Sequence, residues 1–119
     1  MLNAIRKHHA IIAKWMVDVY EREANIFRFK ARIVFKNGSL LRIKEYRFSD
    51  GTRKYSYHWE TGKGVLITRW DNAPHWHKIA SHPHHKHVQS AGAIESSGET
   101  HLDAVLEVIA NNIKVIKNK

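Results

Sequence analysis

Histidine side chains gather in one stretch of this sequence. Six of the ten histidines lie between His75 and His87. An imidazole titrates near neutral pH, so a neutral ring can accept a proton while a protonated ring donates one. RNA cleavage by the 2′-hydroxyl needs such a pair, together with fixed cations such as Lys86 and Arg69 for the phosphate charge. The stretch therefore predicts an acid–base site for phosphate chemistry.

Two other interpretations of the same stretch stay open. His75 with His77, His82 with His84 and His85 with His87 repeat an HxH spacing that could bind zinc or another divalent metal. The alternative metal ligands are His75, His77, His82 and His84. Because neither cysteine nor an HExxH helix accompanies them, we expect no cofactor to be required. A third interpretation is a basic loop that binds nucleic acid without catalysis.

The elements around the histidines supply further candidates. The residues expected to carry the chemistry are His75, His84, His85, His87, Glu45, Arg69 and Asp71. The residues expected to contact nucleic acid are Arg28, Lys30, Arg32, Arg47, Lys54, His58 and Lys86. Both sets depend on the predicted strands that place them.

The net charge indicates an anionic partner. Twenty Lys and Arg residues against eleven Asp and Glu give +9 at neutral pH. Contacts from Lys and Arg to phosphate supply most non-specific affinity for nucleic acid, so RNA is the expected partner. A solubilising surface, or a surface that meets an acidic protein, explains the charge equally well.

The hydrophobic periodicity predicts an α+β fold in a single domain, residues 1–119. Apolar residues at three- and four-residue spacings predict helices over about 2–22 and 101–117. Alternation with a period of two predicts four strands over about 26–71, joined by tight turns into an antiparallel β-meander. A histidine-rich loop over 72–87 and a flexible segment over 88–99 complete the expected order.

The turn at Asn37-Gly38 sets the expected register. A two-residue loop pairs Phe35 with Leu40 and places Glu45 on the charged face, in one row with Lys30, Ser56 and Arg69. A three-residue loop would move Glu45 to the apolar face. The strand over 26–36 would form the edge of this sheet, where it could pair with a second copy and give a homodimer.

Composition limits the cellular setting. Cysteine is absent, which disfavours a disulfide-rich secreted scaffold. No apolar run approaches the roughly 20 residues of a membrane-spanning helix. Without a signal-peptide pattern after Met1, we expect a cytoplasmic protein with no membrane contact.

Three motifs also carry a family resemblance. The segments 54–57 (KYSY), 69–75 (RWDNAPH) and 83–87 (PHHKH) resemble the TumE-type toxins of prokaryotic toxin–antitoxin modules. The resemblance covers about 27–87 and continues loosely into the last helix. Glu45 matches a position where an acidic residue is expected, while His82 stands where phenylalanine is usual.

The resemblance implies a growth-inhibiting toxin encoded beside a DNA-binding antitoxin of the winged-helix type. Combined with the histidines and the basic face, it predicts a small ribonuclease that uses histidine acid–base chemistry. The alternatives are a non-catalytic nucleic-acid-binding toxin and a metal-dependent nuclease.

Overall fold

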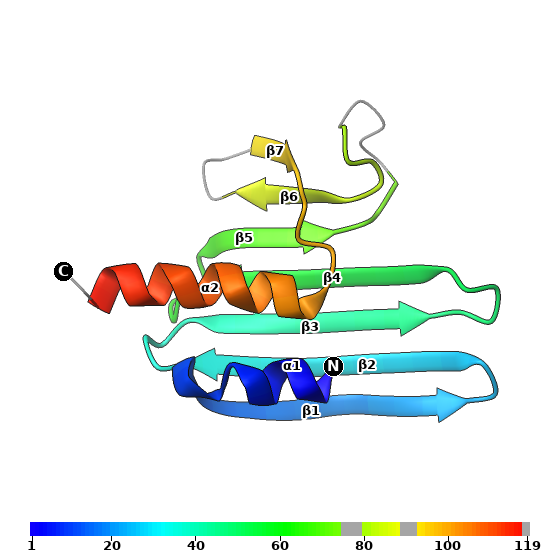
Figure 1. Cartoon of the computed structure of the whole chain (residues 1–119), viewed down its shortest axis with the longest axis horizontal. Helices are drawn as coiled ribbons and strands as arrows, with labels where there is room; N and C mark the ends of the chain where they lie inside the picture. The colour runs from blue at the N-terminus through cyan, green and yellow to red at the C-terminus, as the bar shows by residue number, and fades with distance from the viewer. Residues whose placement is uncertain (75–79, 89–92, 118–119) are drawn as a thin grey trace.

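A computed structural model describes residues 1–74, 80–88 and 93–117. Within these ranges, seven strands form one antiparallel sheet in which neighbours in the chain are neighbours in space. The α+β meander is thus confirmed, but it has seven strands in place of the predicted four (Figure 1). The elements are α1 Leu2–Lys7, a 3-10 turn η1 His9–Ile11, β1 Ile12–Glu23, β2 Ile26–Phe35, β3 Leu40–Arg47, β4 Arg53–Glu60, β5 Leu66–Asp71, β6 His85–Val88, β7 Ala93–Ser96 and α2 Leu102–Lys117.

The predicted N-terminal helix over 2–22 is wrong beyond its first turns. From Ile12 the chain pairs with β2 as strand β1, with a break in register between Val17 and Val19. Apolar residues occupy both faces of this strand, and the irregularity interrupts their alternation. Their spacing along the sequence therefore resembles that of a helix. Pairing along β2 overrides that local pattern. Because β1 pairs with the free edge of β2, the strand that was predicted to form the edge of the sheet is an inner strand.

The C-terminal third is more ordered than expected. The end of the predicted histidine loop is strand β6, and part of the predicted flexible segment is strand β7. Short strands among histidine, serine and glycine give no clear alternation, so their pairing was not visible in sequence. The last helix is confirmed as α2, within a residue of its predicted start.

Three hairpins share one turn geometry, which decides the register of the sheet. Phe35 N–H bonds to the Ser39 carbonyl while Gly38 N–H bonds back to Phe35, and the turns before Thr52 and Val65 repeat this pattern. The third turn residue is a glycine each time, with φ of +86° or +87° that suits a residue without a Cβ. These are three-residue loops of the type I plus bulge kind.

The extra loop residue moves β3 by one position relative to the prediction. Leu40 faces Val34 rather than Phe35, and Glu45 faces Phe29. Because side chains alternate along a strand, this shift reverses the faces of β3. Glu45 and Arg47 therefore lie on the face that carries the helices, and Arg42 and Lys44 lie on the other face.

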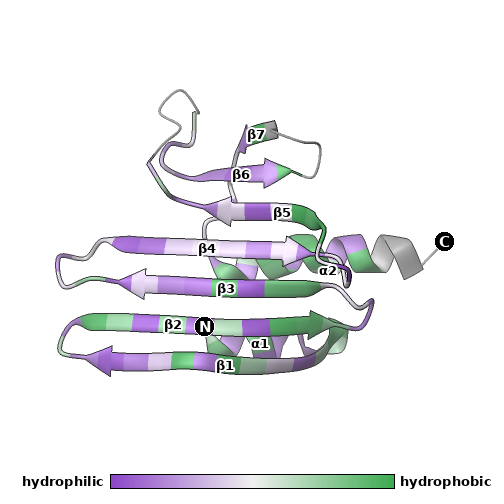
Figure 2. Cartoon of the chain, turned by 180° about the vertical axis from the view of Figure 1, so that it is seen from behind, coloured by the Kyte–Doolittle hydropathy of each residue, from purple (hydrophilic) through white to green (hydrophobic). Residues whose placement is uncertain are grey.

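The two faces of the sheet differ in cover. Helices α1 and α2 lie against one face, with α1 over β1 and β2 and α2 over β3 and β4 (Figure 1). Buried apolar side chains of the inner strands meet Leu102, Val105, Leu106, Ile109 and Ile113 of α2 there. Burying such side chains stabilises the fold by roughly 1.5–3 kcal/mol each. Figure 2 looks onto the opposite face, where the strands lie in front of both helices.

We call this helix-free side the open face. Cross-strand pairing places the following side chains on it: Arg28, Lys30, Arg32, Arg42, Lys44, Tyr46, Lys54, Ser56, His58, Arg69, Asp71, His85 and His87. Within the described ranges, neither helix has a stretch long and apolar enough to cross a membrane.

Candidate functional site

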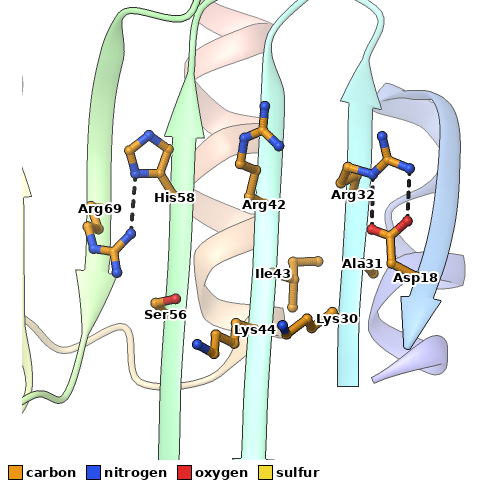
Figure 3. A pocket seen from close by; sticks show the side chains of 10 residues that line it. All are labelled: Asp18, Lys30, Ala31, Arg32, Arg42, Ile43, Lys44, Ser56, His58 and Arg69. Carbon is orange, nitrogen blue, oxygen red and sulfur yellow. Dashed lines mark hydrogen bonds and ion pairs between the residues drawn. The ribbon is translucent and has the colours of Figure 1, made fainter. Parts of the chain in front are cut away.

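One row of basic and titratable side chains crosses the open face. Direct pairing aligns Arg32 on β2, Arg42 on β3, His58 on β4, Arg69 on β5 and His87 on β6. The part of this row from Arg32 to Arg69 lines a shallow pocket with Lys30 and Lys44 (Figure 3). Three arginines and two lysines in one pocket suit an anionic ligand such as a phosphodiester.

Arg69 contacts His58 within the row and Asp71 on its own strand. Its Nη1 donates to Nδ1 of His58 over 3.4 Å, and its Nε donates to Oδ2 of Asp71 over 3.3 Å. A guanidinium carries five N–H donors. Arg69 therefore keeps donors for a ligand while it contacts both neighbours. Figure 3 shows its contact with His58.

The surroundings of His58 lower its pKa and so favour the neutral ring. Partial burial lowers the pKa of His58 below the ordinary 6.5, and the charge of Arg69 lowers it further, against a smaller opposing effect of Glu60. Nε2 of His58 lies 4.0 Å from a Glu60 oxygen, and the same oxygen accepts a 2.7 Å bond from Nε of Arg42. A neutral imidazole beside a phosphate-binding arginine can act as a general base.

A second group of side chains lies one strand further along the same face. Nε2 of His85 is 2.8 Å from Oδ1 of Asp71, and Nε2 of His87 is 3.5 Å from Oδ2. Asp71 and His85 are directly opposite each other in the β5–β6 register, and His87 follows at the next position on the same face. We call Asp71, His85 and His87 the Asp71 cluster.

The environment of His87 differs from that of His58. Burial lowers the pKa of His87, and the Asp71 carboxylate is the largest influence in the opposite direction, while His85 and Arg69 lower it. The pKa of His87 is lowered overall, as that of His58 is, but the largest influence after burial is the Asp71 carboxylate for His87 and the Arg69 cation for His58. The two rings on either side of Arg69 lie in different electrostatic surroundings.

His84 is not part of this group. Neighbouring residues of an extended segment point to opposite faces, and His84 lies on the helix side, where the Tyr55 ring stacks on it at 5.8 Å between centroids. Nδ1 of His84 is 2.9 Å from the Tyr55 hydroxyl. Burial lowers the pKa of His84 and raises the pKa of Tyr55 to about 12. The expected convergence of His84 with His85 and His87 on one face is therefore wrong.

Glu45 is likewise placed away from the predicted row. It is 1% exposed, and its Oε1 accepts a 2.6 Å bond from Nε of Arg53 and a 3.3 Å bond from the Tyr57 hydroxyl. Arg47 lies 3.5 Å from its other oxygen. The predicted position on the open face is wrong, because the hairpin at Gly38 has three residues in its loop.

The predicted nucleic-acid contacts divide between the two faces. Arg28, Lys30, Arg32, Lys54 and His58 lie on the open face, and Arg28 and Arg32 are paired with Glu21 and Asp18 of β1. Arg47 and Lys86 lie on the helix side; Lys86 is 3.5 Å from Glu99. Arg42 and Lys44 also lie on the open face and were not among the predicted contacts. The Asn-Gly-Ser turn, interpreted as a three-residue loop with a glycine bulge, would have assigned them to this face.

The predicted metal ligands are only partly described. His75 and His77 lie outside the described residues. His82 is exposed and His84 lies on the helix side. The Asp71 cluster is a different potential ligand set, in which one nitrogen or oxygen from each residue lies within 4.8 Å of the others.

Comparison with known proteins places the chain in a family. A family model described as Toxin TumE matches residues 1–116. The chain therefore belongs to the TumE toxin family, as its motifs indicated, and this membership implies a cognate antitoxin. No curated protein and no solved structure matches it.

Proposed function

We propose that this toxin cleaves RNA on the open face of its sheet. The observation that carries the proposal is the row Arg42, His58, Arg69 and His87, which crosses four adjacent strands. It combines two imidazoles with two permanent cations on a surface that the helices leave uncovered. Membership of a toxin family is consistent with a growth-inhibiting activity of this kind.

Binding rests on phosphate contacts. Lys30, Lys44 and Lys54 form no ion pair with any residue in the described ranges, so their ammonium groups are available to RNA. Arg42 and Arg69 border the same pocket. Each phosphate contact releases a counterion, so affinity falls as salt concentration rises.

Arg69 receives the scissile phosphate. Adjacent strands are about 4.8 Å apart, so His58 and His87 start from backbones roughly 10 Å apart with Arg69 between them. A phosphate on the guanidinium therefore lies between the two rings. Transfer of the Arg69 Nη1 hydrogen bond from His58 to the phosphate frees the Nδ1 lone pair of His58.

The chemical step then needs no further group. Nδ1 of His58 takes the proton of the ribose 2′-hydroxyl as its oxygen attacks phosphorus. The bond from phosphorus to the 5′-oxygen breaks, and protonated His87 gives that oxygen its proton. The products are a 2′,3′-cyclic phosphate and a free 5′-hydroxyl, and Arg69 stabilises the additional negative charge during transfer.

Asp71 and His85 position His87. The Asp71 carboxylate contacts both rings, and His85 is held on its other side by the Pro83 carbonyl, 3.0 Å from Nδ1. Asp71 also opposes the lowering of the His87 pKa by burial, and so supports the protonated form that a general acid needs. The antitoxin, which we propose is a DNA-binding protein of winged-helix type, would have to prevent RNA from reaching this face or prevent the step itself.

The test is incubation of the purified protein with total RNA, with and without a chelator. We expect cleavage products that end in a cyclic phosphate, in both conditions. The matched variants are His58→Ala on the open face and His101→Ala, an exposed residue at the start of α2. RNA binding without cleavage by the folded wild-type protein would instead favour a toxin that acts by binding alone.

A further inference from the structure

The Asp71 cluster has the geometry of a metal site. Its three ligand atoms, one from each side chain, lie within 4.8 Å of one another. Nε2 of His85 is 2.8 Å from Oδ1 of Asp71, and Nε2 of His87 is 3.5 Å from the other oxygen, Oδ2. A tetrahedral zinc ion with bonds of about 2.0–2.1 Å needs ligand atoms roughly 3.3 Å apart. Small side-chain adjustments would bring the three atoms to that spacing.

The orientation of His85 provides a second, independent observation. Its Nδ1 lies 3.0 Å from the Pro83 carbonyl oxygen, which can only accept a hydrogen bond, so Nδ1 carries the hydrogen. A neutral ring has one N–H, which leaves a lone pair on Nε2 facing Oδ1 of Asp71 at 2.8 Å. Two lone pairs at that distance need a cation between them, either a proton or a metal ion.

This arrangement is the one that metal-binding histidines usually have. Their second ring nitrogen donates to a carbonyl or carboxylate, which fixes the ring and aims the other nitrogen at the metal. Here the sheet itself holds the ligands, because Asp71 and His85 are cross-strand partners and His85 and His87 are two positions apart on β6. The site is therefore preformed by backbone pairing.

The ligand types select the class of ion. Two imidazole nitrogens and one carboxylate oxygen suit zinc and its neighbours in the first transition row, whereas magnesium and calcium prefer oxygen ligands. Each oxygen of Asp71 already accepts one hydrogen bond, Oδ1 from the backbone N–H of Ala73 and Oδ2 from Arg69. Oδ1 is the oxygen nearer to His85 and would bind the ion through its second lone pair. Asp71 and His85 are buried and His87 is half-buried, so the ligand atoms lie largely away from bulk solvent.

We propose that Asp71, His85 and His87 bind a divalent transition-metal ion, and that the bound ion inhibits RNA cleavage. The second half rests on the proposed function: the ion binds Nε2 of His87, so this ring can no longer form the imidazolium that gives a proton to the 5′-oxygen. Zinc would be a reversible inhibitor of the toxin.

The structure provides a matched control for this proposal. His8, Asp103 and Glu107 form a second group of one histidine and two carboxylates with ligand atoms within the same 4.8 Å. Lys7 already contacts both carboxylates, at 3.3 Å and 3.8 Å, and both are about half exposed. We expect no metal binding there, because the Lys7 ammonium already pairs with both carboxylates and because both are exposed to water.

Metal binding is measured by titrating zinc chloride into protein purified without metal affinity, using calorimetry. We expect one ion per chain for the wild type and for Asp103→Asn, and none for Asp71→Asn, His85→Gln or His87→Gln. Thermal melts of each variant establish that it is folded; His87→Gln changes a half-buried residue and is the variant expected to keep the wild-type melt. Binding that persists in folded His87→Gln and Asp71→Asn, or that is lost in Asp103→Asn, would overturn the site.

Inhibition is measured on the same preparations by RNA cleavage with and without zinc. We expect roughly 100-fold slower cleavage by the zinc-loaded wild type, the size of losing a general acid, and recovery on chelation. Faster cleavage with zinc would overturn the inhibitory role. If no preparation cleaves RNA, the proposed function fails, and calorimetry still decides whether the Asp71 cluster binds metal.

Discussion

Two buried carboxylates lie on opposite faces of this sheet, each surrounded by basic side chains. Glu45 contacts Arg53 and Arg47 on the helix side, and Asp71 contacts His85, His87 and Arg69 on the open face. Their exposed fractions are similar, at 1% and 6%. Their chemistry differs because of the partners and what covers them.

The partners of Glu45 have permanent charges. Arginine does not lose its proton in the accessible pH range, and the Glu45–Arg53 pair is closed by the Tyr57 hydroxyl and by the Thr100 carbonyl at the start of α2. Asp71 instead contacts two imidazoles, the side-chain type that can exchange a proton near neutral pH and can bind metal ions. A buried carboxylate with basic neighbours is therefore a structural ion pair on the covered face, where the neighbours are arginines. On the open face, where two of the neighbours are histidines, it is part of a candidate site.

The largest expected effect is on the open face. His58→Ala and His87→Ala should each slow RNA cleavage by roughly 100- to 10,000-fold, because each removes a proton-transfer group. Urea denaturation should show both variants folded. The measurement is the initial rate on a defined RNA, beside His101→Ala as the control; wild-type rates in both folded variants would refute the assigned roles.

Next in size is the loss of the covered ion pair. Glu45→Ala should destabilise the fold by roughly 3–5 kcal/mol, because it leaves the Arg53 charge partly buried without its partner. We expect a lower urea midpoint, and cleavage that persists in the fraction of molecules still folded. Arg28→Ala breaks an exposed pair with Glu21 and should cost less than about 1 kcal/mol. A Glu45→Ala protein with wild-type stability but without cleavage would show that Glu45 has a catalytic role, as the sequence predicted.

A smaller effect separates the cations of the two faces. Lys44→Ala should weaken RNA binding and reduce the slope of log affinity against log salt by about 1, the value for one lost phosphate contact. Lys86→Ala, on the helix side, should leave both quantities unchanged. Fluorescence anisotropy over a salt series measures them, and equal losses in the two variants would show that RNA does not distinguish the faces.

The smallest effect concerns pH. The pKa of His58 is lower in the folded protein than the ordinary 6.5 of an exposed histidine, so below pH 6.5 the unfolded chain binds a proton that the fold does not. The contribution of His58 to stability is therefore full above that pH and falls as the solution is acidified towards the folded pKa. His58→Gln should reduce this dependence in urea melts between pH 7 and 5; an unchanged dependence would exclude His58 as its source.

Local sequence was enough for several features of this protein. Strong alternation identified β2 and β4, glycine-containing turns marked the hairpins, and the periodic apolar residues of α2 gave a helix with the right bounds. Family motifs likewise identified the toxin family. These features depend on residues close together in the chain, whose patterns do not require knowledge of distant partners.

Only the tertiary structure decided which residues meet. The chain from Ile12 is a strand because β2 offers it a hydrogen-bonding edge, against its helix-like spacing. One additional turn residue exchanged Glu45 for Lys44 on the open face. His85 and His87 were separated from His84 when β6 joined β5, since a paired strand directs successive side chains to opposite faces. The alternation of side chains along a strand can be seen in the sequence, whereas the register between paired strands decides which side chains share a face and form a site.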